Sequence, residues 1–207
     1  MAEFTLYVVN GSCSFASHAA LEHAGADYEA IPVDFQNEEQ RSEKYLAVNP
    51  KGRVPALVSG DGILTESPAI LAYIAQKFPE ANLAPLNDPW LFGQMQSFNA
   101  YLCATVHVAH AHKFRGYRWA KEQSSFDDMQ ANVPRTMTEC FQLIESEMLK
   151  GPWVLGDTFS VADFYLVTMS RWLEFDEVDT RLLPAVMDHR ARMHELPAVK
   201  AVAASGG

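Results

Sequence analysis

The stretch from residue 49 to residue 67 constrains the fold more than any other part of this chain. It begins with a loop rich in proline and glycine, and two short apolar runs follow. Between those runs lies Asp61-Gly62, a dipeptide typical of the tight turn of a β-hairpin. Ser67 and Pro68 then have the properties of a helix N-cap and of a first helical residue. The sequence therefore predicts two antiparallel strands that lead directly into a helix.

The first turn of that predicted helix is also a candidate binding site for an anion. A helix N-terminus leaves backbone N–H groups without partners inside the helix, and the hydroxyl of Ser67 accompanies them. Free N–H groups and the positive end of the helix dipole both favour a negatively charged ligand. We therefore expect Ser67 and its turn to receive a small carboxylate.

The residues before this stretch have the pattern of a βαβ unit. Residues 4–9 predict a buried strand, residues 13–24 a helix, and residues 28–33 a second strand. A polar helix over residues 38–47 precedes the hairpin. The resulting order indicates a mixed four-stranded sheet with helices on its faces, which is the arrangement of the thioredoxin superfamily. The sequence thus predicts a thioredoxin-like α/β domain over residues 1–78.

The remaining residues predict a second domain that is entirely helical. The segment 79–89 contains three prolines and no helical period, so we interpret it as a linker. Residues 90–207 contain only helix-like apolar segments, and Ser160 with Asp163 forms a variant capping box that gives Asp163 a structural role. The helices are expected over roughly 90–119, 126–149, 160–174 and 183–195.

Composition excludes several classes of function. With 207 residues and 48% hydrophobic side chains, the chain is able to bury a sizeable core. Its formal net charge is −10 and it has no long run of Lys or Arg, so we expect no nucleic-acid partner. No segment approaches the roughly 20 apolar residues of a membrane span, and the first residues lack the basic region of a secretory signal. These features predict a cytoplasmic protein without membrane contact.

Cysteine usage points to a free thiol. The chain has three cysteines, Cys13, Cys103 and Cys140, without a Cys-x-x-Cys pair, which argues against a disulfide framework or a zinc ribbon. Cys13 lies where the first predicted strand turns into the first predicted helix. The positive end of that helix is expected to make its thiol ionise more readily, although a small buried apolar residue is an alternative interpretation.

The motif around the hairpin resembles the glutathione-binding half of the glutathione transferase family. Residues 54–57, Val-Pro-Ala-Leu, and residues 65–70, Thr-Glu-Ser-Pro-Ala-Ile, carry this resemblance. In that family the peptide bond before the matching Pro55 is cis, and the matching Val54 pairs through its backbone with the cysteinyl part of glutathione. The resemblance also implies that Glu66 faces the ammonium group of the γ-glutamyl end, while the helix N-terminus at Ser67 receives its carboxylate.

Within the family, residues 11–18, Gly-Ser-Cys-Ser-Phe-Ala-Ser-His, are similar to the bacterial beta class. In that class a cysteine followed by a serine stands at the start of the first helix. The similarity extends through Arg171-Trp172 and therefore covers nearly the whole chain. There are two departures: Val8 occupies the place of a tyrosine, and no lysine occurs near residue 36 to bind the glycine end of glutathione. Lys51 and Arg53 are candidates for the missing contact.

Three histidines lie close together in the first long helix of the predicted helical domain. His107 and His110 share a helix face but His112 points elsewhere, and no acidic residue or cysteine beside them completes a metal site. The beta class has a histidine on this helix that faces the sulfur across the cleft. Gap-free counting from Tyr101 places His107 at that position, whereas counting from the His-Lys pair of the class places His112 there, and we favour His107. A histidine that titrates near neutrality would hydrogen-bond a thiolate or protonate a leaving group. Asn99 matches a residue that reaches across the dimer interface.

We therefore predict a bacterial, cytoplasmic glutathione transferase that functions in detoxification as a homodimer. Glutathione, the co-substrate, is expected to bind through Val54, Pro55, Glu66, Ser67 and Asn99, without a metal. Cys13 and His107 are the predicted catalytic residues, and the helical domain is expected to hold a small hydrophobic electrophile. A first alternative is a glutathione-dependent thiol–disulfide or peroxide reductase in which Cys13 forms the covalent intermediate. A second alternative is a binding or regulatory protein that has kept the fold and lost turnover.

Overall fold

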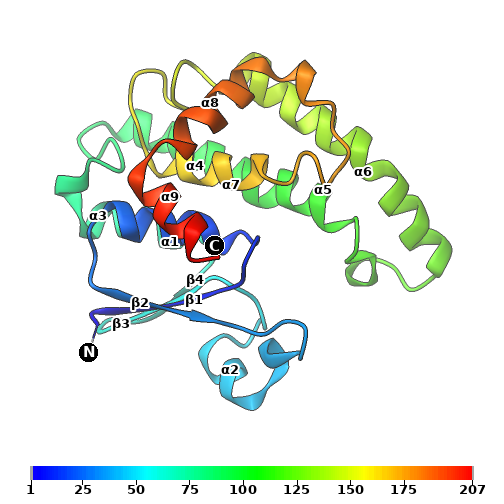
Figure 1. Cartoon of the computed structure of the whole chain (residues 1–207), viewed down its shortest axis with the longest axis horizontal. Helices are drawn as coiled ribbons and strands as arrows, with labels where there is room; N and C mark the ends of the chain where they lie inside the picture. The colour runs from blue at the N-terminus through cyan, green and yellow to red at the C-terminus, as the bar shows by residue number, and fades with distance from the viewer. Residues whose placement is uncertain (1, 207) are drawn as a thin grey trace.

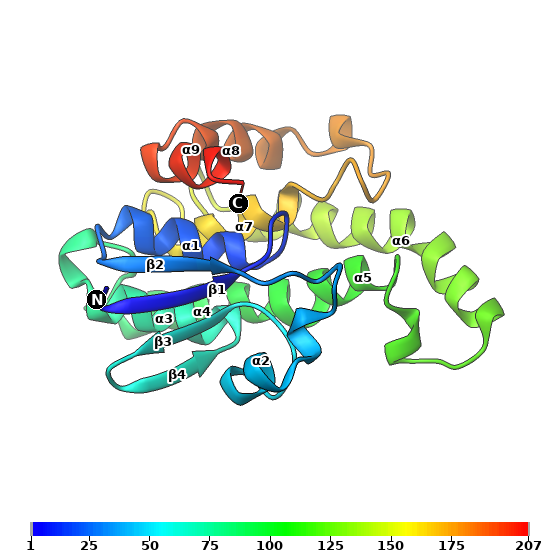
Figure 2. The same ribbon diagram turned by 60° about the horizontal axis from the view of Figure 1, so that its bottom comes forward.

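The computed structural model describes residues 2–206, which form a sheet-containing half followed by a helical half (Figures 1 and 2). The elements of the first half are β1 (Phe4–Val8), α1 (Ser14–His23), β2 (Tyr28–Pro32), α2 (Glu43–Val48), β3 (Ala56–Ser59), β4 (Gly62–Thr65) and α3 (Ser67–Lys77). The helices of the second half are α4 (Pro89–Tyr101), α5 (His107–Ala111), α6 (Gln123–Leu143), α7 (Val161–Ser170), α8 (Pro184–His194) and α9 (Pro197–Ala204).

The four strands form one mixed sheet in the order β2-β1-β3-β4. β1 runs parallel to β2 and antiparallel to β3, and the β3–β4 hairpin is antiparallel. Burial alternates along β1 because successive side chains of a strand point to opposite faces of a sheet. Helices α1 and α3 cover one face and α2 lies on the other (Figure 1). This arrangement confirms the predicted thioredoxin-like fold of the first half.

The hairpin and the helix after it form where the sequence predicts them. The strands pair from Ala56 opposite Thr65 to Ser59 opposite Gly62. The two turn residues are therefore Gly60 and Asp61, one position earlier than the predicted Asp61-Gly62, because Gly62 already pairs as the first residue of β4. The N-cap prediction is wrong by one residue, because Glu66 and not Ser67 precedes the first turn of α3. The reason is that the backbone carbonyl of Glu66 already accepts the first helical hydrogen bonds, from the N–H groups of Ala69 and Ile70.

The first long helix of the second half is shorter and less regular than predicted. α4 continues through a π-helical turn into α5, which ends at Ala111 instead of near residue 119. The chain then bends, and a short 3₁₀ turn follows at residues 116–118. Gly116 permits this bend because it lies against the ring of Phe126, where an added Cβ atom would come within 2.9 Å of Cδ1. The segment from Phe114 to Trp119 is therefore a loop.

The two halves share one continuous hydrophobic core. Helix α1 packs on α3 within the first half and also on α7 and α9 of the second half. The predicted capping box at the start of α7 is confirmed: Ser160 caps the helix, and the carboxylate of the fully buried Asp163 accepts from the N–H of Ser160. None of the helices in the described part of the chain combines the length and the apolar character needed to cross a bilayer.

Candidate active site

A cavity of about 340 Å³ lies where the two halves of the molecule meet. Its lining comes from the β1–α1 loop, the loop before β3 and the start of α3 on one side, and from residues 103–119, Tyr165 and Trp172 on the other. Most of the residues singled out in the sequence line it. These are Cys13, Val54, Pro55, Glu66, Ser67 and His107.

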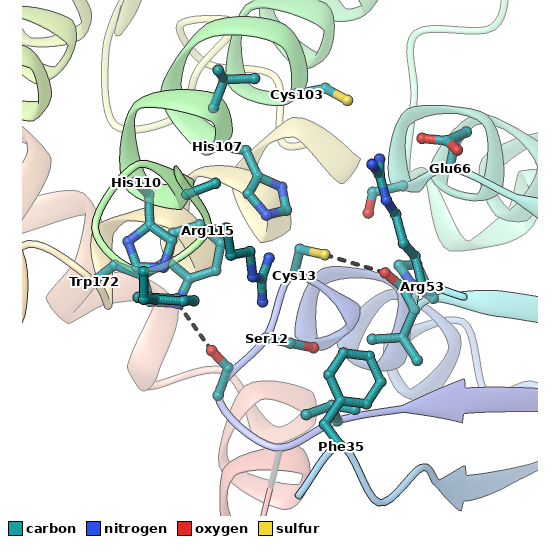
Figure 3. A pocket seen from close by; sticks show the side chains of 18 of the residues that line it. Ser12, Cys13, Phe35, Arg53, Glu66, Cys103, His107, His110, Arg115 and Trp172 are labelled. Carbon is teal, nitrogen blue, oxygen red and sulfur yellow. Dashed lines mark hydrogen bonds between the residues drawn. The ribbon is translucent and has the colours of Figure 1, made fainter. Parts of the chain in front are cut away.

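Cys13 is the N-cap residue of α1, and its side chain is 8% exposed. The thiol donates a hydrogen bond to the backbone oxygen of Val54 across the cavity, with 3.5 Å between Sγ and O (Figure 3). Burial raises the pKa of Cys13 to about 11, although a hydrogen bond with Ser67 and the charge of Arg115 oppose this shift. The expectation that the thiol ionises readily is therefore wrong, because loss of hydration outweighs the helix N-terminus.

The loop before β3 is held in shape by hydrogen bonds to one carbonyl. The hydroxyl of Tyr45 and the side-chain amide of Asn49 both donate to the backbone oxygen of Arg53, at 2.7 and 2.6 Å. The Val54-Pro55 peptide bond that follows is cis. The backbone oxygen of Val54 accepts from the Cys13 thiol, so this part of the backbone faces Cys13 and is suited to pairing with an extended ligand.

Glu66 and Ser67 lie at the start of α3, where the lining meets the helix N-terminus. Glu66 has a φ of 76°, a value that costs a residue other than glycine about 1–3 kcal/mol and that is common at functional sites. Its carboxylate pairs with Lys51, whose Nζ lies 2.5 Å from Oε1 and 2.7 Å from the hydroxyl of Thr65. Lys51 is therefore already engaged. Of the two candidate cations for the glycine end of glutathione, only Arg53 lines the cavity.

The three histidines of the second half have different surroundings. The His107 ring points toward Cys13 (Figure 3), while His112 lies outside the lining and packs its ring against Trp119. Burial, followed by electrostatic interactions with His110 and the nearby arginines, lowers the pKa of His107 to about 3. His107 is thus a neutral imidazole at physiological pH, which corrects the expectation that it titrates near neutrality.

His110 belongs to a network that the sequence did not reveal. Its Nδ1 lies 2.7 Å from the carboxylate of the fully buried Asp176, and its ring stacks on Trp172 with 4.0 Å between the centroids. The indole N–H of Trp172 donates to the backbone oxygen of Gly11 at 2.9 Å (Figure 3). The network therefore connects the helical half to the loop that carries Cys13. Asp176 is 66 residues from His110 in the chain, so no local pattern points to this pair.

Asn99, which was predicted to contact glutathione from across a dimer interface, is not part of the cavity. Asn99 lies outside the cavity lining and is fully buried, with its amide donating to Gln96. It exposes no surface with which to contact another subunit, so its predicted role is not supported. Within residues 2–206, no group of three or more potential ligands is arranged to hold a metal ion.

A thioredoxin-like sheet domain, a helical domain and a thiol facing the cleft between them define a transferase of the glutathione-binding class. Family models agree with this class: the glutathione S-transferase N-terminal domain matches residues 2–76, and the C-terminal domain matches residues 130–204. The chain belongs to the glutathione S-transferase family. The predicted family and enzyme class are thereby confirmed.

Individual relatives match over almost the whole chain. Glutathione S-transferase GstA of Escherichia coli O157:H7 is 31% identical and aligns with 97% of this chain and 98% of its own. The structure of a glutathione transferase homologue from Sulfitobacter, with bound glutathione, is 48% identical and has a TM-score of 0.96. The match covers 100% of this chain and 99% of the homologue. The beta class enzyme of Sphingomonas chungbukensis is 31% identical with a TM-score of 0.84, covering 98% of both chains, which confirms the resemblance to that class.

Proposed function

We propose that this glutathione transferase joins the sulfur of glutathione to a small hydrophobic electrophile that is held against the helical domain, residues 90–207. The observation that carries the proposal is the convergence of Cys13, Val54, Glu66 and Ser67 on one cavity. Glu66 faces the ammonium group of glutathione, and the N-terminus of α3 at Ser67 faces its γ-glutamyl carboxylate. The cysteinyl part pairs with the backbone of Val54, which brings its sulfur to Cys13.

Cys13 acts in this proposal as a hydrogen-bond donor to the glutathione thiolate. Its raised pKa keeps the thiol protonated, and the S–H that donates to Val54 in the free protein is available to a neighbouring thiolate. Because the Cys13 thiol is mostly uncharged at neutral pH, it is a poor nucleophile itself. This favours conjugation over the alternative thiol–disulfide chemistry through Cys13.

His107 and Arg53 assist the binding of glutathione in this proposal. His107 is neutral, so it donates or accepts one hydrogen bond near the sulfur without adding charge. Arg53 replaces the lysine that the beta class uses for the glycine carboxylate, because Lys51 is engaged by Glu66. Both assignments rest on the position of these side chains in the cavity lining.

Two copies of the subunit form a symmetric homodimer in the cytoplasm in this proposal, and the reaction serves detoxification. Ile63 on β4 and Trp90 at the start of α4 are 48% and 78% exposed, and we assign these two apolar side chains to the subunit interface. Size-exclusion chromatography with light scattering measures the mass of the protein in solution and so tests the proposed homodimer. A mass near that of one 23.1 kDa chain would contradict the dimer.

Calorimetric titration with glutathione tests the binding site. Glu66→Gln removes the charge opposite the ammonium group and is expected to weaken binding roughly tenfold to a hundredfold. Glu195→Gln is the matched control, since Glu195 pairs with Lys200 on the surface, and it should bind like the unmodified protein. Failure of the unmodified protein to bind millimolar glutathione would overturn the proposal.

Cys13→Ala separates the proposed reaction from the two alternatives. Conjugation should fall by about a factor of ten, because one hydrogen bond to the thiolate is lost. A reductase that uses Cys13 covalently would lose all thiol–disulfide exchange and would show a glutathione adduct on Cys13 by mass spectrometry. Tight glutathione binding without turnover of any electrophile in a broad panel would favour a binding protein.

A further inference from the structure

The active-site cavity is rich in positive charge although the chain as a whole is strongly acidic. Arg53, Arg115 and Arg118 line it, and Glu66 is the one carboxylate among the described lining residues. The formal net charge of the chain is −10. A cleft that concentrates one sign of charge attracts ligands of the opposite sign. The cavity is therefore suited to anions.

None of these three arginines is neutralised by a carboxylate of the described chain. Arg135, Arg181 and Arg190 each pair with an acidic side chain on the surface. By contrast, the groups that act electrostatically on the half-buried Arg115 are Arg118, Tyr117, Arg53 and Cys13. Arg53 and Arg118 are exposed, so the cost of an unpaired buried charge falls on Arg115, unless a ligand supplies a carboxylate to it.

Glutathione does not account for all of this charge. Arg53 extends toward Glu66 on one side of Cys13 and thus belongs with the groups proposed to bind glutathione (Figure 3). Arg115 approaches Cys13 from the opposite side, beside His110 and Trp172 (Figure 3). It comes from the loop after α5, as does Arg118, so both belong to the part of the cavity proposed to hold the electrophile.

The surroundings of Arg115 and Arg118 are aromatic. Phe114 and Trp119 flank the two arginines in the chain and also line the cavity, with 49% and 46% of their surfaces exposed. The guanidinium carbon of Arg115 lies 5.0 Å from the centroid of the Phe114 ring. Flat aromatic faces next to a planar guanidinium suit a planar ligand with a carboxylate, because the ring stacks while the carboxylate pairs with the cation.

We propose that the electrophile is an aromatic anion, whose carboxylate or similar acidic group binds Arg115 and Arg118 and whose ring packs against Phe114 and Trp119. This inference rests on the proposed conjugation function. With an activated aryl chloride, the glutathione sulfur forms a bond to the ring carbon, and chloride departs with the electron pair of the broken C–Cl bond. The thiol proton passes to solvent, so the reaction needs no oxidant or reductant.

Two matched electrophiles test the inference: 4-chloro-3,5-dinitrobenzoate and its neutral methyl ester. Each catalysed kcat/KM is divided by the rate constant of the uncatalysed reaction with glutathione, because the ester is intrinsically more reactive. The unmodified protein should prefer the carboxylate at least tenfold by this measure. Arg115→Gln and Arg118→Gln should each reduce that preference roughly tenfold, since each removes one charge-assisted hydrogen bond that the carboxylate makes and the ester cannot.

Arg135→Gln is the control, because Arg135 is exposed on α6 and pairs with Glu139 away from the cavity. It should leave both reactions unchanged. Equal normalised rates for the two electrophiles would overturn the inference while leaving conjugation intact. The inference would also be overturned if Arg115→Gln or Arg118→Gln raised the KM for glutathione to the same extent with either electrophile. That result would mean that the arginine binds glutathione and not the electrophile. Turnover of neither electrophile would instead count against the proposed function.

Discussion

At the residue scale, Cys13 illustrates how burial competes with local electrostatics. A cysteine at a helix N-terminus is commonly acidic, because the free N–H groups and the dipole stabilise the thiolate. Cys13 has this position and yet its pKa is raised to about 11 by burial. Position in the sequence reveals the helix but not the loss of water around the sulfur, which is why the expected direction of the shift was wrong.

The raised pKa of Cys13 leads to a direct chemical prediction. At pH 7.5 and without glutathione, iodoacetamide should modify Cys13 at least a hundredfold more slowly than a simple thiol of pKa near 9, since the thiolate fraction is about a hundredfold smaller. Peptide mapping by mass spectrometry measures the rate. The protein unfolded in urea is the control, and there Cys13 should react normally. Modification of the folded protein as fast as the simple thiol would contradict the prediction.

His107 supplies a second prediction, on the pH dependence of stability. Its pKa is lowered to about 3, whereas an unfolded histidine titrates near 6.5. Between these values the unfolded chain binds a proton that the native protein does not, so the free energy of unfolding decreases as the pH falls below about 6.5. His107→Asn should make the decrease between pH 7.5 and pH 4.5 smaller by about 1 kcal/mol, after allowance for partial exposure. Urea titrations at the two pH values measure it, and an unchanged decrease would refute the assignment.

At the scale of elements, the start of α7 is the part most dependent on one side chain. The carboxylate of Asp163 accepts hydrogen bonds from the N–H groups of Val154 and Ser160, and it lies 3.0 Å from Nε2 of His189. Asp163→Ala would leave two buried N–H donors and the His189 ring without a partner. The variant should lose roughly 3 kcal/mol or more of unfolding free energy, because each unpaired buried group costs about 1–3 kcal/mol.

Ser160→Ala is the comparison for this prediction. It removes the hydroxyl that accepts from the N–H of Ala162 and donates a long hydrogen bond, 3.4 Å, to the Asp163 carboxylate, while the backbone bonds to Asp163 remain. The expected loss is about 1 kcal/mol, the usual value for an N-cap. Urea unfolding followed by circular dichroism measures both variants. If Asp163→Ala were no less stable than Ser160→Ala, the bonds to Val154 and His189 would not contribute as argued.

The elements that could be predicted from the sequence are those with local signals. The Asp61-Gly62 turn signal and the Ser160 capping box act within a few residues. The structure has the capping box as predicted and the hairpin turn one residue earlier, at Gly60-Asp61. The end of α5 at Ala111 was missed, because the bend depends on contact between Gly116 and Phe126. The His110–Asp176 pair was missed for the same reason: its partners come from distant parts of the chain. Local patterns thus identified the thiol and the helix N-terminus, while tertiary contacts determine their protonation and surroundings.

At the scale of the whole molecule, the shared core makes the two halves a single structural unit. α1 is sandwiched between the sheet and the helical half, with α7 and α9 packed against it (Figure 2). The hydrogen bond from Trp172 to Gly11 adds a polar link beside the active site. Separating the halves would expose apolar surface on α1, which costs about 25 cal/mol for each Å² uncovered. We therefore expect that neither half remains folded once the other unfolds.

Urea unfolding with two probes tests this cooperativity. All four tryptophans, Trp90, Trp119, Trp153 and Trp172, belong to the helical half, so tryptophan fluorescence reports mainly on that half. Hydrogen exchange of the amides in β1 and β3 reports on the sheet. The two probes should give the same midpoint, because the core cluster extends from Phe4 of β1 to Val202 of α9. If the sheet amides lost protection at a lower urea concentration than the fluorescence change, the two halves would unfold separately. The geometry of the cleft between them would then depend on a weaker interface than the core packing implies.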